Sequence, residues 1–251
     1  QVKAAIEMLA LTRLQHLSAS TIEEKERLQR YDEKQRKLLV QLMEVDGELS
    51  DINSHLLLDW NPYNQMKSAP FFDSIWMFGV KQFDIVIGNP PYGAKYPAEH
   101  KKYFREHYKS AKTISGKQKG SLDTFSLFIE HGFNIVKQGG YVHFIVPLSV
   151  VSSDSMTALH QLLLNHCETI KVASFCDKPL QLFKNSHKKT AIISFGKTNT
   201  VCQKLLMTQM YRWHSEITRK DLLEKMRFIE SLKFRLDGRF PKISFPIEKR
   251  I

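Results

Sequence analysis

Cysteine is scarce in this chain, and so are long hydrophobic runs. Only three of the 251 residues are cysteines, and Cys167, Cys176 and Cys202 show no Cys-x-x-Cys spacing. This pattern excludes a disulfide-stapled secreted scaffold and predicts no zinc site, so we expect reduced structural thiols in a cytoplasmic protein. No stretch reaches the roughly 18 apolar residues of a membrane span. Residues 1–20 also lack the uninterrupted apolar core of a secretory signal, so no membrane partner is expected.

Glycine is scarce too, whereas positive charge is abundant. The chain has 11 glycines and no Gly-x-Gly, and only Gly47 and Gly79 precede residue 83. It therefore lacks the glycine-rich loop with which open α/β enzymes approach nucleotide-like cofactors. The formal net charge is +11 and the pI is about 9.5, a balance typical of proteins that bind polyanions. With 42% hydrophobic residues, the chain can build a substantial core.

One short stretch organises the rest of the chain. Residues 83–88, Phe-Asp-Ile-Val-Ile-Gly, predict a buried strand, and Asn89, Pro90, Pro91 and Tyr92 follow at once. The two prolines lack N–H groups and fix φ, so the backbone has to leave the sheet here. The asparagine is then left at the carboxyl end of a parallel strand, where open α/β sheets bind their ligands.

The chemistry of this stretch suits an exocyclic amine, whose lone pair is delocalised into the ring and is a poor nucleophile. Asn89 Oδ1 and the Pro90 carbonyl are two neighbouring acceptors that can hold both amine hydrogens and favour a more tetrahedral nitrogen. No strong base is required. Tyr92 offers a flat face on which a base taken out of a duplex can stack. The alternative is an ordinary strand-to-loop turn, since proline and asparagine are common turn residues.

The strand and its Asn-Pro-Pro-Tyr motif resemble the adenine-N6 DNA methyltransferases, particularly the large restriction–modification type. The resemblance covers roughly residues 58–200. It implies an α/β, partial Rossmann-like fold that uses S-adenosylmethionine, with helices on both faces of a parallel sheet. It also implies site-specific methylation of double-stranded DNA within a restriction–modification or phage-defence enzyme. The flipped adenine would be held by the catalytic residues Asn89, Pro90, Pro91 and Tyr92, and its N6 would attack the sulfonium methyl in line.

Later segments extend the resemblance. We expect a helix over 123–136 ended by the Gly139–Gly140 pair, strands over 141–146, 169–175 and 191–195, and a helix over 149–167. In the family, the loop before the last of these strands supplies the second wall of the base pocket. On that basis Phe183 would face Tyr92 across the adenine, and Lys188 and Lys189 would contact phosphate.

A basic stretch follows the motif. Residues 95–119 contain eight lysines and arginines against two glutamates, with aromatic residues interleaved. This mixture beside a catalytic strand suits a nucleic-acid backbone, and we assign Lys101, Lys102 and Arg105 to DNA binding. A solvated helix face is the alternative for some of these side chains. Gly116 and Gly120 suggest a flexible tip.

The flanking regions have other patterns. Residues 1–57 predict a helical arm with a heptad stripe, which comprises Leu28, Tyr31, Leu38, Leu42, Val45, Leu49, Ile52 and Leu56. The arm is either a structural insertion, as one long helix or a hairpin that turns at Asp46–Gly47, or a dimerising coiled coil. Residues 58–82 predict an aromatic-rich loop that packs Trp60 and Trp76 against the sheet. Residues 201–251 predict a basic helix over 220–234 and then an extended segment that leads to a missing region.

The cofactor-binding half is missing from the pattern, so no cofactor-binding residue is assigned. Because the glycine loop is absent and the first residue is Gln1 rather than Met, we expect a fragment of a larger enzyme. The chain alone should not methylate, and the missing half would lie on the same polypeptide or on a partner subunit. Two alternatives stay open: a protein glutamine-N5 methyltransferase, and a catalytically inactive DNA-binding or assembly module. The recognition sequence, an attached nuclease and the oligomeric state are left open by the sequence.

Overall fold

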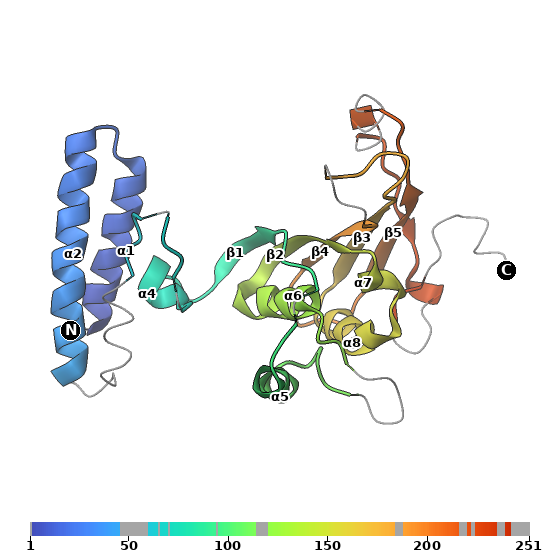
Figure 1. Ribbon diagram of the computed structural model, residues 1–251, viewed down its shortest axis with the longest axis horizontal. Helices are drawn as coiled ribbons and strands as arrows, with labels where there is room; N and C mark the ends of the chain where they lie inside the picture. The colour runs from blue at the N-terminus through green and yellow to red at the C-terminus, as the bar shows by residue number, and fades with distance from the viewer. Residues whose placement is uncertain are drawn as a thin grey trace. The chain divides into compact units, whose positions relative to one another are not determined.

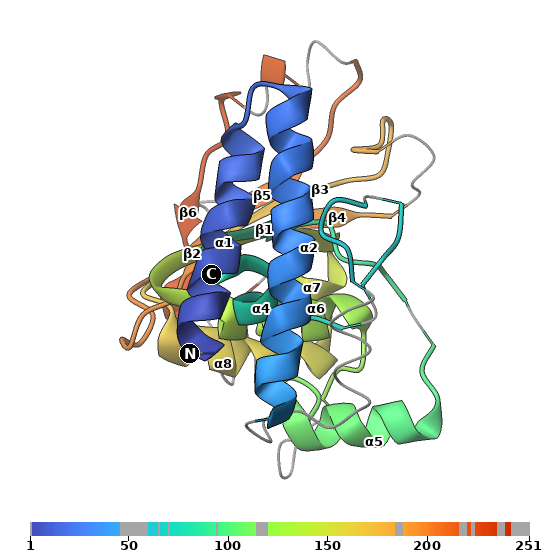
Figure 2. The same cartoon turned by 90° about the vertical axis from the view of Figure 1, so that its left-hand side faces the viewer.

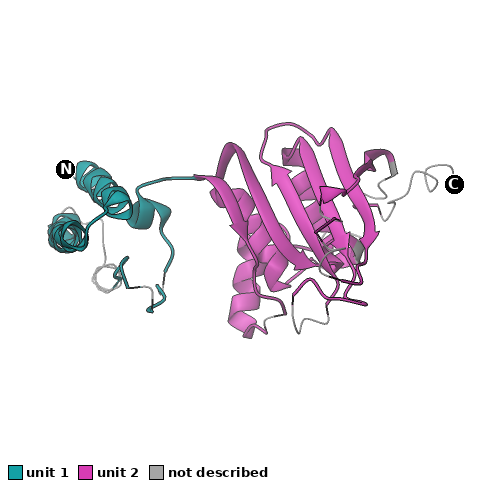
Figure 3. Ribbon diagram, turned by 90° about the horizontal axis from the view of Figure 1, so that it is seen from above, with its two compact units in different colours: residues 1–82 teal, residues 83–251 magenta. Residues whose placement is uncertain are grey.

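The structure is a computed structural model with two compact units, residues 1–82 and 83–251 (Figure 3). Each unit is described by itself. The described residues are 2–45, 60–64, 66–69, 71–93, 95–113, 120–183, 188–215, 220–221, 224–234 and 239–241.

The first unit is a helical hairpin. Helix α1 (Val2–Ser18) and helix α2 (Ile22–Val45) lie side by side (Figures 1 and 2). They are joined by a three-residue turn, after which the Thr21 hydroxyl caps α2 by accepting from the Glu24 N–H at 3.2 Å. The hairpin therefore turns at residues 19–21, and the alternative turn at Asp46–Gly47 lies outside the described residues.

The predicted heptad stripe is only in part the buried face of α2: Leu28 is buried, and Leu49, Ile52 and Leu56 lie outside the described residues. Tyr31 and Leu38 are 42% and 49% exposed and Val45 is 86% exposed, whereas Asp32 and Arg36 are buried. For Tyr31, Leu38 and Val45 the prediction was wrong, because the buried face of α2 consists of the ion-paired Asp32 and Arg36 together with Leu39 and Val40.

Residues 60–82 complete the helical unit. The short helix α4 (Ser74–Phe78) buries Trp76 in a cluster with Leu9 and Leu39, and Trp60 packs against the same cluster. Both tryptophans are core residues as predicted, but they pack against the helices instead of the sheet. Gly79 ends α4 with φ +70°, and a Cβ there would lie 2.0 Å from the Ala10 Cβ, so the approach of α4 to α1 requires glycine.

The second unit is an α/β structure around a six-stranded mixed sheet. The strand order is β1-β2-β4-β3-β5-β6. The β1/β2 and β3/β5 pairs are parallel and the β2/β4, β3/β4 and β5/β6 pairs are antiparallel. The strands are β1 (Phe83–Gly88), β2 (Val136–Pro147), β3 (Thr169–Phe175), β4 (Thr190–Gly196), β5 (Lys204–Tyr211) and β6 (Ile229–Glu230). Since β4 alone among the first five strands is reversed, the carboxyl ends of β1, β2, β3 and β5 lie along the same edge of the sheet, that is, the edge formed by the strand ends and not by an outermost strand.

Three helices cover one face of this sheet, and they are α6 (Thr124–Ile135), α7 (Ser149–Ser152) and α8 (Thr157–His166). Their apolar side chains form the main core with those of the strands. On the other face, the buried residues are Ala173 and Phe175 on β3, Tyr211 at the end of β5 and Trp213 just after it. Among the described residues, side chains of non-helical segments cover them. Helices were expected on both faces, and the described part of the chain places them on one.

Strand β1 is less buried than predicted. Ile85 and Ile87 are 60% and 79% exposed. The strand lies at the end of the sheet order, and Tyr141 on the neighbouring β2 is also 54% exposed on that face. Within the described residues, nothing pairs with the outer edge of β1 or covers these side chains.

The C-terminal region differs most from the prediction. Residues 204–211 form strand β5, and of 220–234 only residues 220–221 and 224 are α-helical among those described. Phe240 is buried, and its N–H donates to His160 Nδ1 at 3.1 Å while the two rings stack at 3.9 Å. His160 Nε2 in turn donates to the Val150 carbonyl at 2.6 Å, so this neutral histidine ties residues 239–241 to α8.

Two smaller boundaries also shift. Helix α6 ends at Ile135, and β2 begins at Val136, so the Gly139–Gly140 pair lies inside a strand and does not cap the helix. The helix predicted over 149–167 is divided into α7, the 3₁₀ helix η1 (Asp154–Met156) and α8.

Candidate active site

The Asn-Pro-Pro-Tyr segment stands where the sequence predicted it. It leaves β1 at the carboxyl end of a parallel pair, with Gly88 opposite Phe144 of β2. Asn89 is exposed, and Pro90 is buried beneath it. The fixed φ of the prolines turns the chain out of the sheet, so the asparagine amide stands at the edge of the sheet and faces solvent.

Tyr92 is joined to Asn89 more closely than the sequence indicated. Its hydroxyl is placed to donate to Asn89 Oδ1 at 2.6 Å and to the Ile145 carbonyl at 3.0 Å. Its ring packs partly against the main core, and burial raises the pKa of its hydroxyl. A hydroxyl has one hydrogen, so the two acceptors compete for it. Asn89 Oδ1 keeps a second lone pair, which an incoming amine can use.

The start of β4 forms the neighbouring part of the site. The Leu148 N–H donates to the Lys189 carbonyl at 2.9 Å, which fixes the entry of β4 beside the end of β2. Lys188 Nζ lies 5.6 Å from the centre of the Tyr92 ring, a cation–π distance. The structure therefore brings together two segments that are almost 100 positions apart in the sequence. The family resemblance led us to expect the segment before β4 beside Tyr92, with Phe183 facing its ring, but it did not predict Lys188 over that ring.

Phe183 lies on the segment after β3 and is 36% exposed. Its ring and the Tyr92 ring make no contact with each other, and residues 184–187 lie outside the described part of the chain. Its role as the second wall of a base pocket therefore stays a prediction.

The basic stretch after the motif is a helix rather than a loop. Helix α5 (Ala98–His107) buries none of its residues, and Lys101, Lys102 and Arg105 are all exposed. Aromatic rings stiffen it, since Tyr96 and Tyr108 each pack on Phe104, with ring centres 4.9 and 5.8 Å away.

Hydrogen bonds join the segments before and after α5 to helix α6. The Tyr96 hydroxyl donates to Thr124 Oγ1 at 2.9 Å, and the Lys109 and Ser110 N–H groups donate to the buried Glu130 carboxylate at 2.8 and 2.7 Å. A Cβ at Gly120 would lie 2.3 Å from the Lys112 carbonyl oxygen, so this glycine is tightly packed and not part of a flexible tip. Gly116 lies outside the described residues.

A known family matches this chain over most of its length. The model of the Eco57I restriction-modification methylase matches residues 3–183. The chain belongs to the Eco57I restriction-modification methylase family. The chain is also similar to two curated type II proteins and to a solved structure.

The two curated relatives are far longer than the chain. The type II restriction enzyme and methyltransferase RM.Eco57I of Escherichia coli is 32% identical over 126 residues, which are 47% of this chain and 11% of that protein. The type II methyltransferase M.TthHB8I of Thermus thermophilus is 32% identical over 118 residues, 45% of this chain and 26% of that protein. The chain thus spans only a small part of the relatives that it matches.

Among solved structures, similarity is found to a nuclease-deletion mutant of the Type ISP restriction-modification enzyme LlaGI in complex with a DNA substrate mimic. The sequence identity is 16%, the TM-score is 0.48, and the comparison covers 62% of this chain and 18% of that one.

The family match begins at residue 3 and so includes the helical unit, whereas the motifs in the sequence supported a resemblance over residues 58–200 alone. The unit that precedes β1 is helical in its described residues, and the sequence contains no Gly-x-Gly. The described residues contain no cluster of three metal-ligating side chains. No helix in the described part of the chain is long and apolar enough to cross a membrane.

Proposed function

We propose that this chain is the catalytic half of an adenine-N6 DNA methyltransferase in a restriction–modification or phage-defence enzyme. The observation that carries the proposal is the exposed Asn89 amide at the carboxyl end of a parallel strand, with Tyr92 hydrogen-bonded to it at 2.6 Å. Membership of a restriction-modification methylase family supports a methyltransferase acting on DNA.

In this proposal Asn89 Oδ1 and the Pro90 carbonyl accept the two hydrogens of the adenine amine. The nitrogen then becomes more tetrahedral, and its lone pair is directed to the methyl group. The Tyr92 hydroxyl holds the asparagine amide in place from the side of β2, while its ring offers a stacking face. Pro91 keeps the segment extended away from the sheet.

The base has to leave the duplex to reach Asn89, because N6 is not accessible in a stacked pair. Phe183 is proposed as the opposite wall of the pocket. Lys188 and Lys189 supply positive charge for the phosphates on either side of the flipped nucleotide, and Lys188 already lies over the Tyr92 ring. Lys101, Lys102 and Arg105 on α5 add a second, exposed basic surface for double-stranded DNA.

The methyl donor is proposed to be S-adenosylmethionine, held by protein outside these 251 residues. The unpaired edge of β1 and the exposed Ile85 and Ile87 suit a further parallel strand and its covering helix. That part could come from the same polypeptide or from a partner subunit. Calorimetric titration of S-adenosylmethionine into the 251-residue chain should show no binding, and tight binding would contradict this division of roles.

The base-binding part of the proposal can be tested without the cofactor. A duplex in which one adenine is unpaired is easier to open, so the chain should bind it more tightly than the fully paired duplex. Tyr92→Ala should abolish this preference, and the matched control Tyr92→Phe, which keeps the ring, should retain it. Equal preference in the alanine variant and the unsubstituted chain would overturn the proposed pocket.

A further inference from the structure

The site described above occupies only part of one edge of the sheet. Because β1, β2, β3 and β5 run in the same direction, the segments that follow β3 and β5 stand at the same edge as Asn89. Neighbouring strands are about 4.8 Å apart, so in the order β1-β2-β4-β3-β5 these segments lie roughly 14 to 19 Å along the edge from β1.

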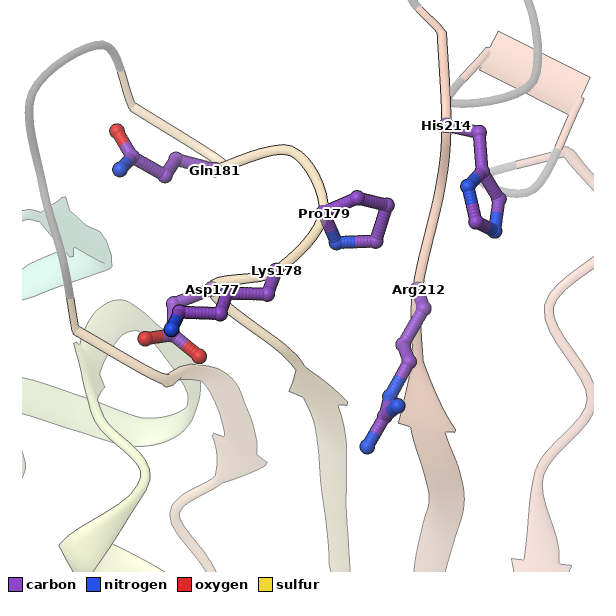
Figure 4. A pocket seen from close by; sticks show the side chains of 6 residues that line it. All are labelled: Asp177, Lys178, Pro179, Gln181, Arg212 and His214. Carbon is purple, nitrogen blue, oxygen red and sulfur yellow. The ribbon is translucent and has the colours of Figure 1, made fainter.

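A hollow of about 540 Å³ opens between these two segments (Figure 4). Residues 177–181 lie on one side and residues 212–214 on the other, and the lining residues are Asp177, Lys178, Pro179, Gln181, Arg212 and His214. An adjoining hollow of about 560 Å³ shares Arg212 and His214 with the first and continues to Lys225.

The side chains of the second segment are held in alternation. Tyr211 and Trp213 are buried with Phe175 on the face opposite the main core, and Arg212 and His214 are exposed between and after them. The Tyr211 hydroxyl also accepts from the backbone N–H of Arg227 at 2.8 Å. The buried aromatic residues therefore fix the backbone from which the arginine side chain extends.

The charge of the hollow favours an anion. Lys178 and Arg212 are both exposed and form no ion pair within the described residues. Among those residues Asp177 is the one carboxylate that lines this hollow, and Asp221 lines the adjoining one together with Lys225. An arginine fork next to a lysine is well suited to a phosphate group.

We propose that this hollow, named here the β3–β5 groove (Asp177–Gln181 and Arg212–His214), binds a backbone phosphate of the DNA that carries the target adenine. The inference rests on the proposed function, because the Asn89 site fixes where the DNA lies. An axial rise of 3.4 Å per base pair places the contacted phosphate roughly four to six base pairs from the flipped base. The groove thus acts as a second anchor that sets the orientation of the duplex along the edge of the sheet.

The test measures duplex affinity against salt concentration by fluorescence anisotropy. Each phosphate contact contributes about 0.9 to the slope of log affinity against log salt. The double variant Lys178→Gln/Arg212→Gln, which loses this one phosphate contact, should therefore show a loss of affinity between 50 and 200 mM salt that is roughly three- to fourfold smaller than that of the unsubstituted chain. Lys204→Gln is the matched control, because Lys204 begins β5 at the opposite edge of the sheet; it should leave the slope unchanged.

Duplex length distinguishes the groove from a general charge effect. The difference should be present with ten base pairs on each side of an unpaired adenine and absent with three. A double variant whose slope equals that of Lys204→Gln, or changes equally on both duplexes, overturns the groove. If the double variant loses its fold, Arg212→Gln is compared with Arg212→Lys, which should restore the slope.

The outcome is separable from that of the base pocket. A length-dependent change of slope together with an unaltered adenine preference in Tyr92→Ala supports the groove and rejects the proposed pocket. The reverse pattern supports the pocket and rejects the groove.

Discussion

Replacement of Asp32 by asparagine should remove most of the stability of the helical unit. Asp32 is 0% exposed and lies between two buried arginines. Its Oδ1 accepts from Arg13 Nε and its Oδ2 from Arg36 Nε, each at 2.8 Å. Asparagine keeps the shape of the side chain but leaves two guanidinium groups buried without a counter-charge. Breaking one buried ion pair in this way costs about 3–5 kcal/mol, and Asp32 completes two of them.

The loss is large because the two arginines also hold the segment after α2. Arg13 Nη1 donates to the Met77 carbonyl at 2.8 Å and also to that of Trp76, and Arg36 donates to the Trp60 carbonyl. At about 0.05–0.15 kcal/mol per residue, an 82-residue unit has a total stability of roughly 4–12 kcal/mol. A cost of 3–5 kcal/mol or more therefore brings it close to unfolding.

Tryptophan fluorescence during urea unfolding is a suitable assay. Of the three tryptophans, Trp60 and Trp76 report on the helical unit and Trp213 on the sheet unit, so a Trp213→Phe background isolates the first transition. Glu33→Gln is the matched control, because Glu33 is the next residue of α2 and pairs only at the surface with Lys37. Its midpoint should stay close to that of the parent protein.

The reasoning would be refuted if Asp32→Asn shifted the midpoint no more than Glu33→Gln does. A further variant tests the cause directly. Replacing Asp32, Arg13 and Arg36 together by apolar residues of similar volume should recover most of the loss, since a buried ion cluster and a packed apolar one are often close in stability.

Two other changes give clear expectations. Burial lowers the pKa of His160 to about 4, whereas the pKa of an unfolded histidine is near 6.5. Below pH 6.5 the unfolded chain therefore takes up a proton that the folded chain does not. The free energy of unfolding of the sheet unit should fall by about 3 kcal/mol as the pH falls from 6.5 through 4. Urea unfolding at both pH values should show this loss, and a His160→Gln variant that keeps the full pH dependence would contradict it. Gly79→Ala should destabilise the helical unit by about 2 kcal/mol or more, because φ is +70° and the new Cβ would clash with Ala10. The control Gly93→Ala has φ +73° with open space around it, so thermal unfolding should show a smaller cost, and equal costs would argue against the clash.

The sequence predicted strand β1 and most of the sheet because their signals are local. The apolar run before Asn89 ends in two prolines, and only a strand followed by a turn accommodates that pattern. Strand β5 was missed for the opposite reason. Residues 204–211, Lys-Leu-Leu-Met-Thr-Gln-Met-Tyr, are rich in good helix formers, and pairing with β3 overrides that propensity.

The candidate site shows the same division. The roles proposed for Asn89 and Tyr92 follow from their residue types and their neighbours in the chain. The position of Lys188 over the Tyr92 ring depends on the reversed strand β4 entering between β2 and β3, which no local pattern reveals. The buried face of α2 was misassigned because a charged residue such as Asp32 belongs in a core only when its partner, here on α1, is known.

The measurement that tests the central claim most directly is product analysis after methyl transfer. The whole protein that contains this chain would be incubated with labelled S-adenosylmethionine and unmethylated genomic DNA, which offers every recognition sequence, and the DNA would be digested to nucleosides. The account predicts N6-methyladenine, and its loss in Asn89→Ala. Label in another nucleoside, label only in protein, or unchanged activity of Asn89→Ala would contradict it.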